Sequence, residues 1–127
     1  MKELIRDKLT VKIFDTRSEM GFVAARTVSE KVSELLQEKE YVSIIFASAP
    51  SQNEFLAALQ EIDLDWNKVN AFHMDEYVGL DKNSPQGFGN FLKDRLFSKV
   101  PLREIHYLNG NANDLEEECN RYSQLLK

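Results

Sequence analysis

The chain has 127 residues, of which 43% are hydrophobic and 29% charged, and its formal net charge is -5. This length fits one globular domain with a core of its own, and the composition excludes a disordered or fibrous protein. The negative charge argues against a duplex nucleic-acid binder, which needs a clustered basic face, and no apolar run approaches the length of a membrane span.

The N-terminal residues and the cysteine content both indicate the compartment in which the protein works. Residues 1–8 mix charged and apolar residues and contain no continuous apolar run, which is not the pattern of a signal peptide. The single cysteine, Cys119, has no partner in the chain for a disulfide. Both observations fit a reducing compartment, so we expect a cytoplasmic protein in which Cys119 is structural.

The first predicted elements are a short strand and a long helix. Residues 10–14 alternate and are rich in β-formers, which predicts a strand. Thr16 and Glu19 have the spacing of a capping box, so a helix should begin there. Its apolar positions recur every three or four residues and predict one buried stripe: Phe22, Ala25, Val28, Val32, Leu35 and Leu36.

A second strand is followed by a turn of small residues. Residues 42–47 are almost continuously apolar, which predicts a strand buried on both faces of a parallel sheet. Ser51 and Glu54 then repeat the capping-box spacing before a helix. A helix that begins directly after a strand can bind phosphate through free backbone N–H groups, although a plain turn with a good cap has the same pattern. The candidate substrate-binding residues here are Ser48, Ala49, Ser51 and Gln52.

The most informative stretch follows the third predicted strand, which begins at Val69. Within a few residues it presents two adjacent carboxylates, Asp75 and Glu76, then the aromatic hydroxyl of Tyr77 and the glycine Gly79. Ligands of parallel α/β sheets bind at the carboxyl ends of the strands, so an acid pair there is placed for chemistry. The alternative is that the two acids only begin a solvated loop.

The remaining elements complete the alternation of strands and helices. Ser84 and Pro85 have the pattern of an N-cap and a first helical residue, and residues 105–108 predict a fourth strand. Asn113, with Glu116 three residues later, is expected to cap the last helix. The order predicts a three-layer α/β/α sandwich with a mainly parallel, doubly wound, Rossmann-like sheet. No cluster of metal ligands is visible, and we expect no metal or other cofactor.

The segment Phe72-His73-Met74-Asp75-Glu76-Tyr77-Val78-Gly79-Leu80 closely resembles the signature of the glucosamine-6-phosphate deaminase (isomerase) family. The likeness extends to residues 84–91, 107–112 and 117–122, in the right order. A long, unusual motif with further ordered matches is far more specific than a lone short pattern.

The resemblance implies an enzyme that converts glucosamine 6-phosphate to fructose 6-phosphate and ammonia. In such an enzyme Asp75 is the general base that moves a proton between C2 and C1 of the opened sugar. The other predicted catalytic residue, Glu76, would orient the loop, Tyr77 would form part of the substrate-binding wall, and His73 would be a buried, satisfied histidine.

The chain also departs from the family pattern. The family has a phosphate turn rich in Gly, Thr and Ser, whereas this chain has Ala47-Ser48-Ala49-Pro50-Ser51-Gln52. Family members continue beyond the position of Lys127 into further strands that carry a ring-opening histidine and basic phosphate ligands. We therefore expect residues 1–127 to be a single α/β domain that is the N-terminal, truncated portion of a longer sugar-phosphate isomerase.

Two other functions fit the same fold. One is a 6-phosphogluconolactonase-like hydrolase, although that branch typically has Asp-Glu-Arg where this chain has Asp75-Glu76-Tyr77. The other is a non-catalytic sensor that binds a sugar phosphate. In each case the expected partner is a small sugar phosphate, not a nucleic acid or a membrane, and a strand edge left unpaired would favour a homo-oligomer.

Overall fold

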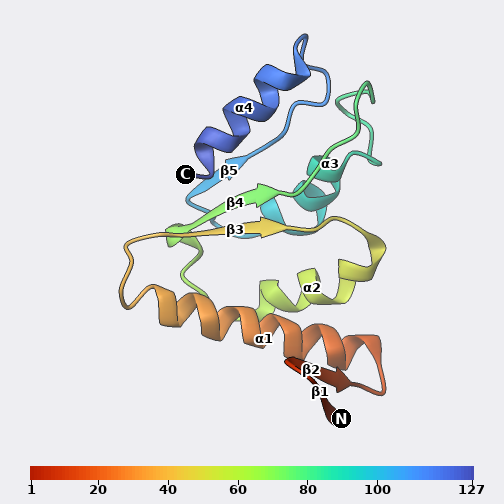
Figure 1. Cartoon of the computed structure of the whole chain (residues 1–127), viewed down its shortest axis with the longest axis vertical. Helices are drawn as coiled ribbons and strands as arrows, with labels where there is room; N and C mark the ends of the chain where they lie inside the picture. Colours follow the sequence, from red (N-terminus) through yellow and green to blue (C-terminus); the bar gives the residue numbers. More distant parts are fainter.

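A computed structural model describes all 127 residues, which form the mixed α/β arrangement in Figure 1. The strands are β1 (Lys2–Arg6), β2 (Leu9–Ile13), β3 (Val42–Phe46), β4 (Val69–His73) and β5 (Glu104–His106). The α-helices are α1 (Arg17–Leu35), α2 (Asn53–Glu61), α3 (Phe88–Leu92) and α4 (Leu115–Leu125). Short 3-10 turns at Pro50–Gln52 and Trp66–Lys68 precede α2 and β4, and α3 continues into a π-helical turn at Lys93–Phe97.

The main sheet has three parallel strands in the order β3, β4, β5. In the β3–β4 pair, Val42 lies opposite Val69 and Phe46 lies opposite His73. Helical segments connect β3 to β4 and β4 to β5. They return the chain to the end of the sheet at which each strand begins, which is how parallel strands are connected. The predicted α/β class with a parallel, Rossmann-like sheet is confirmed.

Helices lie on both faces of this sheet, but they cover the two faces unequally (Figure 1). Val42 and Ala71 point into a core that also contains buried residues of α1, α2, α3 and the π-helical turn. On the other face, Phe72 packs edge to face against Tyr122 of α4, with the ring centroids 5.5 Å apart. Ile45, on β3, remains 53% exposed. The second helical layer therefore covers the β4–β5 side and leaves β3 open.

The predicted strand at residues 10–14 does not join the main sheet. It is β2, and it pairs antiparallel with β1, a strand that we did not predict. The hairpin turn places Asp7 at a φ of 56°, a left-handed conformation that Asp tolerates. Glu3 and Lys12 form an ion pair across the strands at 3.9 Å. One face of the hairpin is mostly apolar, but Leu9 and Ile13 on that face remain 62% and 48% exposed, so the hairpin lies outside the core.

Helix α1 begins as predicted, and five of the six residues of the predicted stripe lie in or against the core: Ala25, Val28, Val32, Leu35 and Leu36. The Oγ1 atom of Thr16 accepts a hydrogen bond from the Glu19 backbone N–H at 3.1 Å. Phe22, expected inside, is 50% exposed, because the helix turns the neighbouring Gly21 toward α2. The buried positions of α1 are Gly21, Ala25, Ser29 and Val32.

Three predicted helix starts are wrong by one to three residues. Ser51 does not cap α2, whose N-cap is Gln52 with no side-chain hydrogen bond. Helix α3 begins at Phe88, three residues after the proline that the pattern placed first. Asp114 caps α4 through the backbone N–H of Glu117 at 3.0 Å, one residue later than predicted. None of the helices combines the length and apolar composition that crossing a membrane requires.

Candidate functional site

The strand register brings two predicted groups of site residues to the same level of the sheet. The last β3–β4 pair is Phe46 with His73, so Ser48 and Asp75 each lie two residues beyond it on neighbouring parallel strands. The backbone N–H of Met74 still donates to the Phe46 carbonyl at 3.2 Å. The turn at residues 48–52 and the acid pair therefore leave the carboxyl edge of the sheet side by side, where α/β proteins bind ligands.

Asp75 presents a free carboxylate at this edge. Its side chain is exposed and forms no hydrogen bond or ion pair within the chain. Its backbone is fixed, because the carbonyl oxygen of Asp75 lies 2.8 Å from Nδ1 of His73. A carboxylate that is uncommitted but held on a rigid support has the properties that a general base requires.

His73 is fully buried and satisfied at both ring nitrogens, as predicted. The backbone N–H of Leu108 donates to Nε2 at 2.9 Å, so the ring proton lies on Nδ1 and is donated to the carbonyl of Asp75. The imidazole thus connects the end of β4 to the segment that follows β5. Its hydrogen bond to the Asp75 carbonyl holds the backbone of Asp75 at the end of β4.

Glu76 is committed to the backbone. Its Oε1 accepts from the N–H groups of Tyr77 at 3.0 Å and Phe88 at 2.8 Å, and its Oε2 accepts from Gly89 at 3.0 Å. This carboxylate therefore caps α3 from a distant segment and provides the negative charge that a helix N-terminus favours. The adjacent acids occupy contrasting environments, one free and one fully engaged.

Tyr77 leaves the loop toward α3. Its ring stacks on Phe88 with the centroids 4.6 Å apart, and the side chain is about half exposed. The hydroxyl has no hydrogen-bond partner in the chain. Tyr77 therefore forms a wall with a free polar end.

The turn at residues 48–52 has donors available at the same edge. The backbone N–H groups of Ser48 and Ala49 have no acceptor in the chain, while the Ser48 hydroxyl donates to the Phe88 carbonyl at 3.3 Å. Ser51 is exposed, and its Oγ accepts a long hydrogen bond of 3.4 Å from the Gln52 side chain. The predicted substrate-binding residues thus form one short turn with free backbone donors, followed by a helix N-terminus.

Arg17 holds this turn against α1. Its guanidinium binds Glu54 through two hydrogen bonds of 2.9 and 2.7 Å, and it also donates to the Pro50 carbonyl at 2.9 Å. The Arg17 guanidinium holds the pKa of the Glu54 carboxyl below its ordinary value. Glu54 is therefore drawn away from the capping role that its spacing predicted.

The loop after Asp75 is fastened to the loop after β5. The Gly79 N–H donates to the Gly110 carbonyl at 3.0 Å, and the Asn111 side chain donates to the Leu80 carbonyl at 2.7 Å. A Cβ atom at Gly110 would collide with the carbonyl oxygen of Tyr77, so the close approach of the two loops requires glycine at this position.

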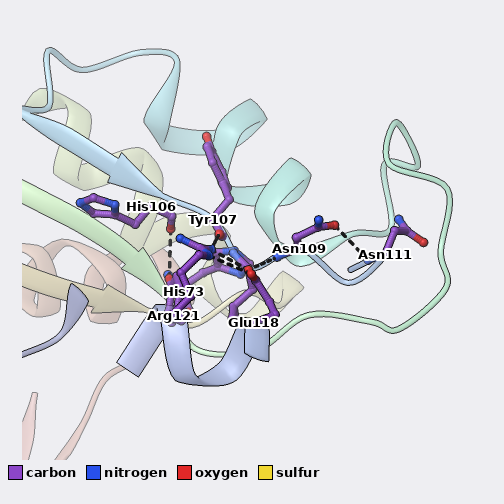
Figure 2. A network of polar contacts seen from close by, with 9 residues as sticks. His73, His106, Tyr107, Asn109, Asn111, Glu118 and Arg121 are labelled. Atoms are coloured by element: carbon purple, nitrogen blue, oxygen red, sulfur yellow. Dashed lines mark hydrogen bonds and ion pairs between the residues drawn. The ribbon is translucent and has the colours of Figure 1, made fainter. Parts of the chain in front are cut away.

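Helix α4 supports the second loop from below, through the network in Figure 2. Glu118 accepts from the Asn109 N–H at 2.8 Å and pairs with Arg121, whose guanidinium also donates to the Tyr107 carbonyl at 2.9 Å. The hydrogen bonds from Arg121, with that from Asn109, lower the pKa of Glu118 to about 2, against desolvation. These contacts fix the loop that follows β5.

The end of the β4–β5 pair is closed by the hydroxyl of Tyr122. It accepts from the His73 N–H at 2.9 Å and points at the carbonyl oxygens of His73 and His106, at 3.1 and 3.0 Å. Burial raises the pKa of this phenol. The last helix therefore completes the hydrogen bonding of the two strands where their backbones separate.

A hollow of about 260 Å³ lies between the two loops and α3. Glu76 and Tyr77 line it, but Asp75 and the predicted phosphate turn do not. Its other walls come from residues without a role in our sequence analysis, among them Lys82, Asn90, Lys93, Tyr107 and Asn109. The predicted site residues therefore lie in two places: Asp75 and the 48–52 turn at the exposed carboxyl edge of the sheet, and Glu76 and Tyr77 in the wall of the neighbouring hollow.

Sequence reasoning gave no role to the supporting residues Tyr107, Gly110, Glu118 and Arg121. The Asn109-Gly110 pair signalled a turn, and Glu118 and Arg121 have the three-residue spacing of a helical ion pair. Nothing in the pattern shows that this ion pair supports a loop nine or more residues earlier in the chain.

Comparison with known proteins gives a consistent family. Residues 15–127 match the family described as glucosamine-6-phosphate isomerases/6-phosphogluconolactonase. A glucosamine-6-phosphate deaminase from Streptococcus sanguinis is 36% identical over 112 residues, which cover 88% of this chain and 46% of that protein. The solved structure of a monomeric glucosamine-6-phosphate deaminase has a TM-score of 0.75 at 26% identity, covering 89% of this chain and 48% of that one.

The same fold occurs in a 6-phosphogluconolactonase from Thermotoga maritima, with a TM-score of 0.75 at 22% identity over 90% of this chain and 51% of that one. This likeness concerns the fold alone. The chain spans about half the length of the relatives that it matches. The matched residues include β3, β4 and β5 and both loops of the site. The chain therefore belongs to the glucosamine-6-phosphate isomerase/6-phosphogluconolactonase family.

Proposed function

We propose that this chain contributes the general base and the phosphate turn of an enzyme that converts glucosamine 6-phosphate and water to fructose 6-phosphate and ammonia. The observation that carries the proposal is the register of β3 and β4, which places Ser48 and Asp75 level at the carboxyl edge of the sheet. The deaminase name of the Streptococcus sanguinis relative supports the choice of reaction.

Asp75 takes the proton from C2 of the opened sugar and returns a proton to C1. One carboxylate can serve both carbons because they are adjacent and their protons leave and arrive on one face of the sugar. The free side chain of Asp75 and the backbone anchor from His73 suit this task. Glu76 acts as a positioning residue, since three backbone N–H groups occupy its oxygens.

The turn at residues 48–52 receives the phosphate. The free N–H groups of Ser48 and Ala49 and the N-terminal end of α2 supply partial positive charge, and the side chains of Ser51 and Gln52 add polar contacts. Tyr77 forms the opposite wall through its stacked ring. The domain acts as one portion of a longer site, in the cytoplasm, where sugar phosphates are metabolised.

The test uses this chain alone and a chimera in which it is followed by the second half of the Streptococcus sanguinis relative. Ammonia release from glucosamine 6-phosphate is measured for both, together with hydrolysis of 6-phosphogluconolactone. We expect ammonia release from the chimera, and a loss of at least about a hundredfold in Asp75→Asn, because general-base catalysis contributes 10²–10⁴-fold.

The matched control is Asp63→Asn, which neutralises an exposed carboxylate away from the site. It should keep the rate of the parent chimera. Lactone hydrolysis without ammonia release would favour the lactonase branch. An Asp75→Asn chimera with full activity would refute Asp75 as the base.

A further inference from the structure

We propose that the hollow between the 76–82 loop, α3 and the 107–111 loop binds a small phosphate monoester, with Lys82 and Lys93 as its cationic groups. This binding site adjoins the one proposed at Asp75 and the 48–52 turn, which do not line it, and the two sites share Tyr77 as a wall. Its volume, about 260 Å³, is near the lower end for ligand pockets and suits a molecule the size of a single phosphorylated sugar.

Two acids and two lysines line the hollow, and of these side chains only the acids have hydrogen-bond partners within the chain. Lys82 and Lys93 form no ion pair with any carboxylate of the chain. Of the two acids in the lining, Glu76 accepts three backbone N–H groups and Asp81 accepts the Asn83 N–H at 2.8 Å. The lining therefore carries two ammonium groups without a carboxylate partner in the chain, and such groups can bind an anionic ligand.

The two lysines are held on one structural unit. The Asn90 side chain donates to the carbonyl of Lys82 at 2.8 Å and to that of Ser84 at 2.8 Å, which ties the loop to α3. Lys93 lies three residues after Asn90, one turn further along the same helical face. The separation of the lysines is therefore set by backbone contacts and not by the lysines themselves.

Neutral donors complete the lining. The side-chain N–H₂ of Asn109 and the hydroxyl of Tyr107 have no partner in the chain, although Asn109 Oδ1 already accepts from the Asn111 N–H at 3.0 Å. Burial raises the pKa of the Tyr107 phenol, so the hydroxyl keeps its proton as a donor. Gly89 leaves room for this ring, since a Cβ there would lie 2.9 Å from Tyr107 Cδ1.

The experiment titrates the chain with fructose 6-phosphate, inorganic phosphate and unphosphorylated fructose. Binding is measured by calorimetry and mapped by backbone amide chemical shifts. We expect both phosphates, but not fructose, to shift the amides of Gly89 and Gly110. We also expect the double variant Lys82→Gln/Lys93→Gln to weaken the binding of fructose 6-phosphate at least tenfold.

The matched control is Lys39→Gln/Lys127→Gln, which removes the same charge from exposed lysines elsewhere and should bind like the parent chain. Asp75→Asn should also bind normally, so failure of the proposed catalytic role leaves this result intact. Circular dichroism of each variant verifies folding. Shifts confined to residues 48–52, equal binding by the two lysine double variants, or equal shifts from fructose would overturn the proposal.

Discussion

At the scale of single residues, the two adjacent carboxylates at the carboxyl edge of the sheet differ in environment, since Asp75 is free and Glu76 is fully hydrogen-bonded. From the sequence alone, either Asp75 or Glu76 could be the general base, since both side chains are carboxylates. What separates them is the position of the N–H groups of Phe88 and Gly89, twelve and thirteen residues later. That position depends on how α3 packs, so the residue pattern alone identified the pair, and only the family resemblance led us to expect different roles for the two acids.

Glu118 gives a pH dependence that can be attributed to one residue. Its pKa in the folded chain is about 2, against an ordinary value of 4.5, mainly because Arg121 donates to it. A lowered pKa means that the unfolded state binds more protons between these values. Stability from this carboxylate is therefore complete above about pH 4.5 and is lost as the pH falls through about 2.

We expect the urea midpoint to fall from pH 5 to pH 2 more steeply in the parent chain than in Glu118→Gln. The change at Glu118 removes the group whose proton uptake differs between the folded and unfolded states. Glu116→Gln, on the exposed side of the same helix, is the control and should retain the parent slope. Parallel curves for the parent and Glu118→Gln would show that this ion pair contributes no measurable stability.

At the scale of elements, contacts between helices override what neighbouring residues predict about helix caps and helix packing. The N-cap bond from Glu19 to Thr16 formed because both residues are local, whereas Glu54 was recruited by Arg17, 37 residues earlier. The apolar period of α1 predicted the helix and most of the face that it buries, but not the close contact at Gly21, because glycine has no side chain to register in a hydrophobic pattern. Strand β1 was missed because three of its five residues are charged, which resembles a solvated terminus.

Glycine substitutions separate packing from helix propensity. In an isolated helix Gly21→Ala would stabilise by about 1 kcal/mol. In this fold the added Cβ would lie 2.7 Å from the backbone carbon of Glu54, so α1 and α2 must separate. We expect a net loss of about 1–3 kcal/mol in the free energy of unfolding, measured by urea denaturation.

Gly87→Ala provides the comparison. The Gly87 backbone has a φ of -60°, and the nearest atom to an added Cβ lies at 3.4 Å, a contact that small shifts can accommodate. This variant should be neutral or gain up to about 1 kcal/mol, because alanine restricts the unfolded chain. The same result at both positions would mean that the α1–α2 contact does not limit stability.

For the whole molecule, the consequential feature is the uncovered side of the sheet at β3. Strand β3 is an edge strand of the sheet. On the face where α4 packs, α4 covers β4 and β5 but not β3. The sequence predicted a strand buried on both faces, which suits a sheet with more neighbours than this chain provides. The fold class and the alternation of helices with the strands of the main sheet were readable from periodicity, but how far the sheet is covered depends on packing that periodicity does not show.

We expect the chain to self-associate through this edge, in line with the homo-oligomer that the unpaired strand favours. Ile45→Lys places a charge on the open face and should shift sedimentation velocity profiles toward the monomer. Val78→Lys, at a position that is 69% exposed on the loop, should leave the profile unchanged. A parent chain that remains a monomer at high concentration would contradict association through β3.

The hydroxyl of Tyr122 has a consequence for how quickly the molecule can form. The amide that it satisfies, on His73, lies 49 positions earlier in the chain. During synthesis, β3 and β4 emerge from the ribosome long before this phenol. Until it arrives, the backbone groups of His73 and His106 at the carboxyl end of the β4–β5 pair lack their hydrogen-bond partner. Closing so long a loop is slow compared with forming a local helix, which makes docking of the final helix a late folding step. The nascent chain is therefore most vulnerable to aggregation and proteolysis in the interval between the emergence of β4 and the arrival of α4.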